Sequence, residues 1–159
     1  MIPEPIRAAD TALELSALMQ PADANFMGVI HGGVILKLID EAAGTCAYRF
    51  ARTRVVTASI DRTSFHHPVQ IGNLVVLKAC VNWAGRTSME IGVRVEAEDP
   101  RTGARRYTTK AYLTFVAIDG DGAPRAIAPL VLEDDEDRRR AADAEARRKA
   151  RLALRPSTG

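Results

Sequence analysis

The chain has 159 residues, of which 47% are hydrophobic and 26% are charged, as is ordinary for one globular domain with a single core. Its formal net charge of +2 at pH 7 is too small to indicate a nucleic-acid-binding surface, so we expect no nucleic acid partner. Cys46 and Cys80 are too few and too far apart for a disulfide framework or a cysteine zinc site, and we expect both to be reduced and buried.

The amino-terminal residues and the hydropathy of the chain bear on its location. Residues 1–7 (Met-Ile-Pro-Glu-Pro-Ile-Arg) hold no apolar stretch of the kind found in signal peptides. No run elsewhere approaches the roughly 20 apolar residues that a membrane-spanning helix needs. We therefore expect a soluble, cytoplasmic protein without a membrane partner.

A strand and a long helix, joined by a loop, are the first predicted elements. Thr11–Met19 reads as the strand, and residues 21–31 form the loop. Residues 33–50 then read as a helix that is apolar around most of its circumference, which is typical of a core helix wrapped by other elements. The exception is a narrow stripe on one helix face, made of Gly33, Lys37, Asp40, Glu41 and Gly44.

Four strand candidates follow the helix, at Val55–Phe65, Leu74–Trp83, Met89–Glu98 and Arg106–Ile118. In the third candidate, apolar residues alternate with charged ones such as Glu90, which predicts one buried face and one solvent face. Short turns join the last three candidates, so we expect an antiparallel meander. The sequence thus predicts an α+β fold, with an antiparallel sheet of five or six strands curled around one long central helix.

The composition changes after Pro129. Residues 133–155 are nearly all acidic residues, arginine and alanine, with acids placed four residues before bases in the order that favours a helix. The segment lacks a wide apolar face, so we interpret it as a solvated and partly frayed helical tail. We therefore divide the chain into a domain of residues 1–132 and a charged tail of residues 133–159 that is helical or disordered.

The stretch of residues 25–41 combines two features that suggest chemistry. Gly32 and Gly33 precede the apolar helix, where unpaired N–H groups and the positive end of the helix dipole can stabilise a developing negative oxygen. Asp40 lies two turns further along, and an acid in a buried helix is costly unless it has a partner or a function. Together they suggest attack on a carbonyl, with backbone amides holding the oxyanion and a carboxylate handling the proton.

Three ordered segments carry a family resemblance. The first contains Asn25, Gly28, Gly32-Gly33 and Asp40, the second is residues 55–73, and the third is residues 85–90. In these segments the chain resembles the hotdog-fold acyl-CoA thioesterases, specifically the cytosolic acyl-CoA hydrolase branch. The resemblance covers roughly Ala12 to Leu130 and leaves the charged tail without an inherited role. It implies the hotdog fold.

The resemblance also implies an activity and a set of roles. The activity is hydrolysis of an acyl-CoA to the free acid and CoA, as in fatty acid metabolism, without a metal or redox cofactor. The amides at Gly32 and Gly33 would form the oxyanion hole, and Asp40 would be the general base or the nucleophile. Asn25 of the partner subunit would position water and substrate, because the family's active site lies between two subunits. A homodimer is then the minimum unit, and a trimer of dimers is expected.

The phosphates of CoA require basic and hydroxyl partners. Arg86, Thr87 and Ser88 are the best candidates, because a turn presents their amides and hydroxyls together. Arg62 and His31 are further substrate-binding candidates, although a loop histidine packed at an interface is equally compatible with the sequence.

Simpler interpretations stay open for several of these residues. Asp40 could pair with Lys37 or an arginine across an interface, and Asn25 could be an Asx-turn residue. His66-His67 looks like a metal pair, yet no third ligand follows at metal-site spacing, so we expect no metal.

Two other functions remain as alternatives to a thioesterase. The first is a non-catalytic acyl-CoA-binding or sensing hotdog protein, against which the retained Asn25 and Asp40 argue. The second is a hotdog acyl-thioester dehydratase, a chemistry that usually pairs a histidine with an acid, whereas His31 lies on the loop.

Overall fold

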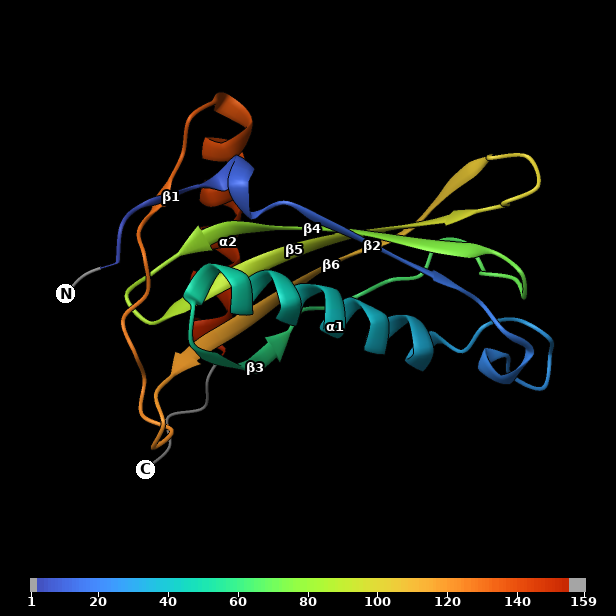
Figure 1. Cartoon of the computed structure of the whole chain (residues 1–159), viewed down its shortest axis with the longest axis horizontal. Helices are drawn as coiled ribbons and strands as arrows, with labels where there is room; N and C mark the ends of the chain where they lie inside the picture. Colours follow the sequence, from blue (N-terminus) through green and yellow to red (C-terminus); the bar gives the residue numbers. More distant parts are fainter. Residues whose placement is uncertain (1–2, 155–159) are drawn as a thin grey trace.

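A curled five-stranded antiparallel sheet with an α-helix on each face makes up the structure (Figure 1). It is a computed structural model that describes residues 3–154. The strands lie in the order β2-β4-β5-β6-β3. Their bounds are Leu13–Leu18 for β2, Arg54–Ile60 for β3, Leu74–Ala84 for β4, Ser88–Glu98 for β5 and Arg105–Ile118 for β6. The helices are α1 (Gly32–Ala51) and α2 (Asp135–Ala153). The predicted α+β hotdog architecture and the β4-β5-β6 meander are confirmed.

Helix α1 packs its apolar side on the inner face of the sheet. Eight of its residues are buried, including Ile35, Ile39 and Phe50. They meet alternate residues of the strands, which are buried on the same face. Full burial of one such large side chain stabilises the fold by about 1.5–3 kcal/mol. This contact fixes where α1 begins and which of its faces stays uncovered.

The first strand is shorter than predicted. Thr11 belongs to a 3₁₀ helix, Ala8–Thr11, and its hydroxyl donates to the carbonyl of Ala8 at 2.7 Å and accepts from the N–H of Val81 at 3.0 Å. These bonds turn the chain out of the strand conformation before β2. Outside the main sheet, β1 (Ile6–Arg7) pairs in parallel with β7 (Leu130–Val131), and a second 3₁₀ helix spans Pro21–Asp23.

Strand β3 ends at Ile60 rather than at Phe65 as predicted. A register shift between Thr57 and Ser59 disturbs its pairing with β6. Beyond Ile60 the chain follows the sheet through separate contacts: the Thr109 hydroxyl donates to the Ser64 carbonyl at 2.7 Å, and the His66 N–H donates to the Thr108 carbonyl at 3.0 Å. Residues 61–69 therefore form a loop that is hydrogen-bonded to β6, and we call it the edge loop.

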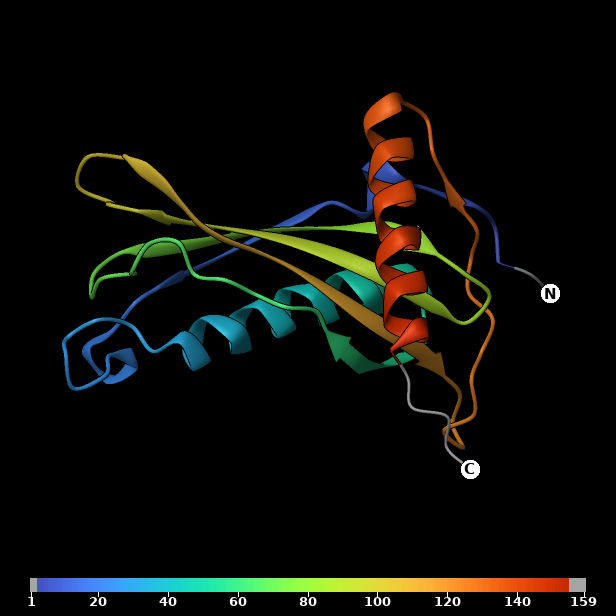
Figure 2. The ribbon, with the colours of Figure 1, turned by 180° about the vertical axis from the view of Figure 1, so that it is seen from behind.

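Residues 133–155 were predicted to form a solvated helical tail. This prediction is wrong for one face of α2, which lies on the sheet (Figure 2). Arg147 donates to both carboxylate oxygens of Glu90, at 2.7 and 3.1 Å, and Asn82 donates to the same carboxylate at 3.1 Å. Glu90 is only 2% exposed, so its predicted solvent position is also wrong. Helix α2 covers this part of the outer face of the sheet.

The far end of α2 is tied to the edge loop. Arg151 donates to both carboxylate oxygens of Asp61, at 2.9 and 3.1 Å. Glu136 pairs with Arg140 at 3.0 Å in the predicted order of an acid four residues before a base, but Arg147 binds Glu90 instead of Asp143, the acid four residues before it. The helical pattern of the segment was therefore predictable, whereas its docking was not.

Across residues 3–154, neither α1 nor α2 combines the length and apolar character needed to cross a bilayer.

We predict that Arg147→Ala lowers the free energy of unfolding by about 3–5 kcal/mol, because it leaves the buried Glu90 carboxylate without a cation. Urea denaturation followed by circular dichroism measures this change. Arg148→Ala is the matched control, since Arg148 is exposed and contacts the Trp83 ring at 5.2 Å. Equal effects of the two substitutions would contradict a specific role for the Arg147–Glu90 pair.

Candidate active site

The start of α1 presents two backbone amides to solvent. His31 is the N-cap residue, its side chain makes no capping bond, and its carbonyl accepts from the N–H groups of Val34 and Ile35. In the described part of the chain, the N–H groups of Gly32 and Gly33 have no acceptor. Both glycines are exposed and the first turn contains no acidic residue, so the positive end of the helix dipole is uncompensated there.

The two glycines leave room for a ligand to approach these amides. A Cβ placed on Gly33 would meet nothing within 4 Å. A Cβ on Gly32 would lie 3.5 Å from the ring of Phe65 in the edge loop, which is ordinary van der Waals contact. The Phe65 ring thus forms a wall beside an open helix mouth.

Asp40 lies on the uncovered stripe of α1 and is oriented by a residue of β3. Its Oδ1 accepts a hydrogen bond from the Thr57 hydroxyl at 2.8 Å. Lys37, considered above as a partner for Asp40, contacts Glu41 instead at 3.6 Å. No cation among residues 3–154 forms an ion pair with Asp40, so its second oxygen is available to a ligand.

Thr57 is the site residue that sequence reasoning missed. It is 17 residues from Asp40 and on a different element, so no spacing rule joins the two. The one available signal was its place in the second segment of the family resemblance.

Asn25 adopts the Asx turn that was the simpler alternative for it. Its Oδ1 accepts from the N–H groups of Met27 at 2.9 Å and Val29 at 3.3 Å. Gly28 completes the loop with a φ of +80°, which glycine adopts without strain. The side-chain NH₂ of Asn25 is then the end left for donation to a ligand. Within residues 3–154, no hydrogen bond joins Asn25 to Asp40 or to the glycine pair.

The predicted substrate-binding residues lie in three places. Arg86 and Thr87 lie in the β4–β5 turn and Ser88 begins β5, toward the C-terminal end of α1 and away from the helix mouth (Figure 1). Arg86 is exposed, and its guanidinium has no ion-pair partner in the described residues. Arg62 is exposed in the edge loop, and His31 is exposed next to the two free amides.

The histidine pair and the cysteines take other roles in this structure. His66 stacks on the Tyr107 ring, and Nδ1 of His67 lies 3.0 Å from the Tyr107 carbonyl oxygen. Burial raises the pKa of the Cys46 thiol to about 12. Burial also raises the pKa of the Cys80 thiol, although Arg140 opposes this effect. Neither thiol is therefore suited to act as a nucleophile at neutral pH.

Comparison with known sequences gives matches along most of this chain. Residues 27–104 match the family model described as the thioesterase superfamily. Protein VdlD of Helicobacter pylori is 40% identical over 114 residues, which is 72% of this chain and 65% of VdlD, so less than two thirds of that relative is spanned. The uncharacterized acyl-CoA thioester hydrolase YkhA of Bacillus subtilis is 37% identical over 117 residues, covering 74% of this chain and 68% of YkhA.

Solved structures of similar fold match almost the whole chain. An apo-hexameric acyl-CoA thioesterase has a TM-score of 0.88 and 37% identity, covering 96% of this chain and 99% of that one. The acyl-CoA hydrolase of Staphylococcus aureus, solved with butyryl-CoA, CoA and CoA disulfide, has a TM-score of 0.85 and 30% identity, covering 93% and 90%. Structures of its variants with one aspartate, one asparagine or one threonine changed to alanine also match.

Proposed function

This chain belongs to the thioesterase superfamily, and on that basis we propose that it hydrolyses an acyl-CoA to a free carboxylic acid and CoA. The observation that carries the proposal is the pair of free amides at Gly32 and Gly33 on the same helix as Asp40, whose carboxylate lacks a cationic partner among residues 3–154. The acyl-CoA substrate class is supported by the names of the similar hydrolases.

The separation of these groups favours an active site shared by two subunits. Gly33 and Asp40 are about 10 Å apart along the axis of α1, at about 1.5 Å per residue, which is too far for both to act on one carbonyl. A twofold-related partner with an antiparallel α1 would bring its Asp40 towards this helix mouth. Asn25 of the subunit that presents the helix mouth, which is the partner of the subunit that supplies Asp40, would then complete the site.

The exposed side of β3 is the surface we assign to that pairing. β3 is at the edge of the sheet, where β6 is its neighbour on one side. Its Val56 and Ile60 are 45% and 43% exposed, and Tyr48 on α1 is 59% exposed. Such apolar groups beside an unpaired strand edge favour association with a second copy. The similarity to a hexameric thioesterase supports a trimer of such dimers.

The chemistry follows from the groups at this site. The thioester carbonyl oxygen points at the free amides, which stabilise the tetrahedral oxyanion. Asp40, held by Thr57, takes a proton from the attacking water, whose oxygen bonds to the acyl carbon. The carbon–sulfur bond then breaks, CoA leaves, and the proton passes to its sulfur. The same placement would serve nucleophilic attack by Asp40, with a mixed anhydride as intermediate.

Residue intervals in the Staphylococcus aureus hydrolase support these assignments. The asparagine, aspartate and threonine that were changed to alanine in that protein are separated by the same numbers of residues as Asn25, Asp40 and Thr57. The proposed roles of these three residues rest on this match together with the Thr57–Asp40 hydrogen bond.

We assign Arg86, Thr87, Ser88 and Arg62 to the phosphates of CoA, and His31 to the region near the thioester. Arg86 supports this assignment because its guanidinium is exposed and without an ion-pair partner in the described residues. As the β4–β5 turn is far from the helix mouth of its own subunit, it would meet CoA bound at another subunit's site. No observation favours the dehydratase or the sensing protein over hydrolysis.

Asp40→Asn should lower kcat/KM by about 10²- to 10⁴-fold on the best substrate of an acyl-CoA chain-length panel, because the base for water is lost. CoA release is followed with a thiol reagent, and circular dichroism checks the fold. Glu41→Gln is the matched control. Undiminished turnover by Asp40→Asn would overturn the assignment. Tight acyl-CoA binding without turnover by the native protein would favour the sensing alternative.

Gly33→Ala should keep the fold, with unfolding free energy unchanged or raised by up to about 1 kcal/mol, since alanine favours helix. Its kcat should fall by about 10²-fold, because the methyl group occupies the space beside the oxyanion amides. Gly44→Ala makes the same change further along α1, where a Cβ would lie 3.7 Å from Phe115. Full activity of Gly33→Ala would exclude this helix mouth as the oxyanion site.

Inactive Asn25→Ala and Asp40→Asn proteins, mixed after dissociation and reassembled, should regain about a quarter of native activity if each site uses both subunits. Half of the dimers would then be mixed, and each would hold one intact site. Activity is measured before and after reassembly, with each variant reassembled alone as the control. A mixture as inactive as its parents would contradict a shared site.

A further inference from the structure

The edge loop is held in place by two elements, β6 and α2. From β6, the Tyr112 carbonyl accepts from the Asp61 N–H at 2.9 Å, and two further hydrogen bonds follow at Ser64 and His66. From α2, Nη1 of Arg151 donates to both carboxylate oxygens of Asp61. In the part of the chain that the structure describes, this is the only ion pair of the loop.

The Arg151–Asp61 pair is better shielded from solvent than an ordinary surface ion pair. The two side chains are 26% and 17% exposed, so water and salt screen their attraction less. Arg151 is in the last turn of α2, where the helix dipole also favours a positive charge. One turn earlier, Arg147 lies over the ring of Tyr112 at 3.5 Å, and the carbonyl of the same Tyr112 holds Asp61.

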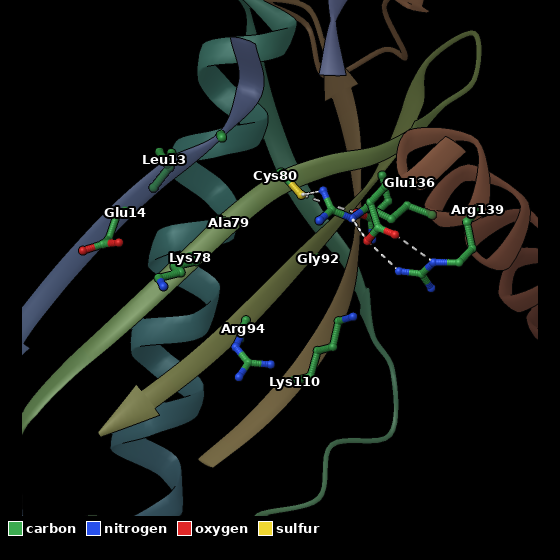
Figure 3. A pocket seen from close by; sticks show the side chains of 13 residues that line it. Leu13, Glu14, Lys78, Ala79, Cys80, Gly92, Arg94, Lys110, Glu136 and Arg139 are labelled. Atoms are coloured by element: carbon green, nitrogen blue, oxygen red, sulfur yellow. Dashed lines mark hydrogen bonds and ion pairs between the residues drawn. The ribbon is translucent and has the colours of Figure 1, made fainter. Parts of the chain in front are cut away.

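Helix α2 is fixed to the sheet independently of the edge loop. Arg147 binds the buried Glu90. Two turns before it, Nη1 of Arg140 lies 3.6 Å from Sγ of Cys80, beside a cavity lined by α2 and the sheet (Figure 3). Between these two arginines, Ala144 is fully buried. Since α2 has these other anchors, its last turn offers the edge loop a fixed point of attachment.

The edge loop reaches from this attachment to the helix mouth. Phe65 follows Asp61 by four residues, and its ring lies 3.5 Å from the position that a Cβ on Gly32 would take. The ring is 44% exposed, so few side chains pack on it and its position depends on the backbone of the loop. Arg62, assigned above to CoA, comes directly after Asp61. A displacement of the loop would therefore move groups that contact substrate and leave the reacting groups in place.

We propose that Arg151 is a positioning residue for substrate binding: through Asp61 it holds the edge loop with Phe65 beside the helix mouth. This inference rests on the proposed function, and it adds a residue from outside the segment 27–104 that matches the thioesterase family model. Arg151 contacts no reacting group, so its effect is on acyl-CoA binding rather than on the chemical step. A loop that is ordered before substrate arrives loses less entropy on binding.

Steady-state kinetics with the best substrate of the acyl-CoA panel tests this role. Arg151→Gln should raise KM by about three- to tenfold and leave kcat within about twofold of the native value. A loss of folded protein would instead lower kcat and leave KM unchanged. Arg151→Lys should keep the native KM, since a single nitrogen of Arg151 makes both bonds to Asp61. Lys149→Gln is the matched control, because it removes the same charge from an exposed residue near the same end of α2.

Hydrogen–deuterium exchange read by mass spectrometry tests the loop without substrate. In Arg151→Gln, peptides that cover residues 61–69 should exchange faster than in the native protein, because their hydrogen bonds to β6 open more often. Peptides from α1 should exchange at the native rate. The emission of Trp83, the sole tryptophan, should stay native, since Arg148 of a docked α2 remains 5.2 Å from its ring.

Three results would overturn the proposal. The first is native exchange of the edge loop in Arg151→Gln, which would show that Arg151 does not hold the loop. The second is faster exchange with an unchanged KM, and the third is an equal rise in KM for Lys149→Gln. Absence of turnover by the native protein would overturn the proposed function and the substrate role with it. Faster exchange in Arg151→Gln would still identify the loop contact in that case, so the two failures are distinguishable.

Discussion

Burial of the apolar side of α1 in the curled sheet determines which of its groups remain available at the surface. The helix is held along its length by residues such as Ile35, Ile39 and Phe50, so it can neither rotate nor slide without exposing them. Its first turn is therefore exposed to solvent with two unpaired backbone amides, and its polar stripe faces the β3 edge. The chemistry proposed here uses groups that the packing of the core leaves uncovered.

The two faces of the sheet carry different groups. The inner face holds α1 and thereby the helix mouth and Asp40, while the outer face carries a polar network under α2 and a row of cations beside it. Alternation along β5 explains how one strand serves both, since Val93 faces the core and Arg94 faces outwards. Each face can thus carry its own set of polar groups without weakening the core.

Local patterns in the sequence were sufficient to predict α1, the β4-β5-β6 meander and the glycine–aspartate motif, because each depends on residues that are close together in the sequence. Contacts between distant residues were not predictable in the same way. Thr57 reaches Asp40 from another element, and Arg147 reaches Glu90 across 57 residues. The charge pattern of α2 is the same for a solvated helix and a docked one, so it predicted the helix but not the burial of Glu90. For Asn25, the Asx turn and a role at a shared site are compatible, since the turn uses the oxygen and leaves the NH₂ group.

The anchoring of α2 has a consequence for the order in which the protein folds during synthesis. Its arginines bind Glu90 and Asp61, which precede them by 57 and 90 residues, so these contacts close long loops and form late. The sheet and α1 are complete in the nascent chain before α2 has left the ribosome. Until then the carboxylate of Glu90 is solvated rather than paired. Docking of α2 is thus a late step, which seals the outer face after the sheet has formed.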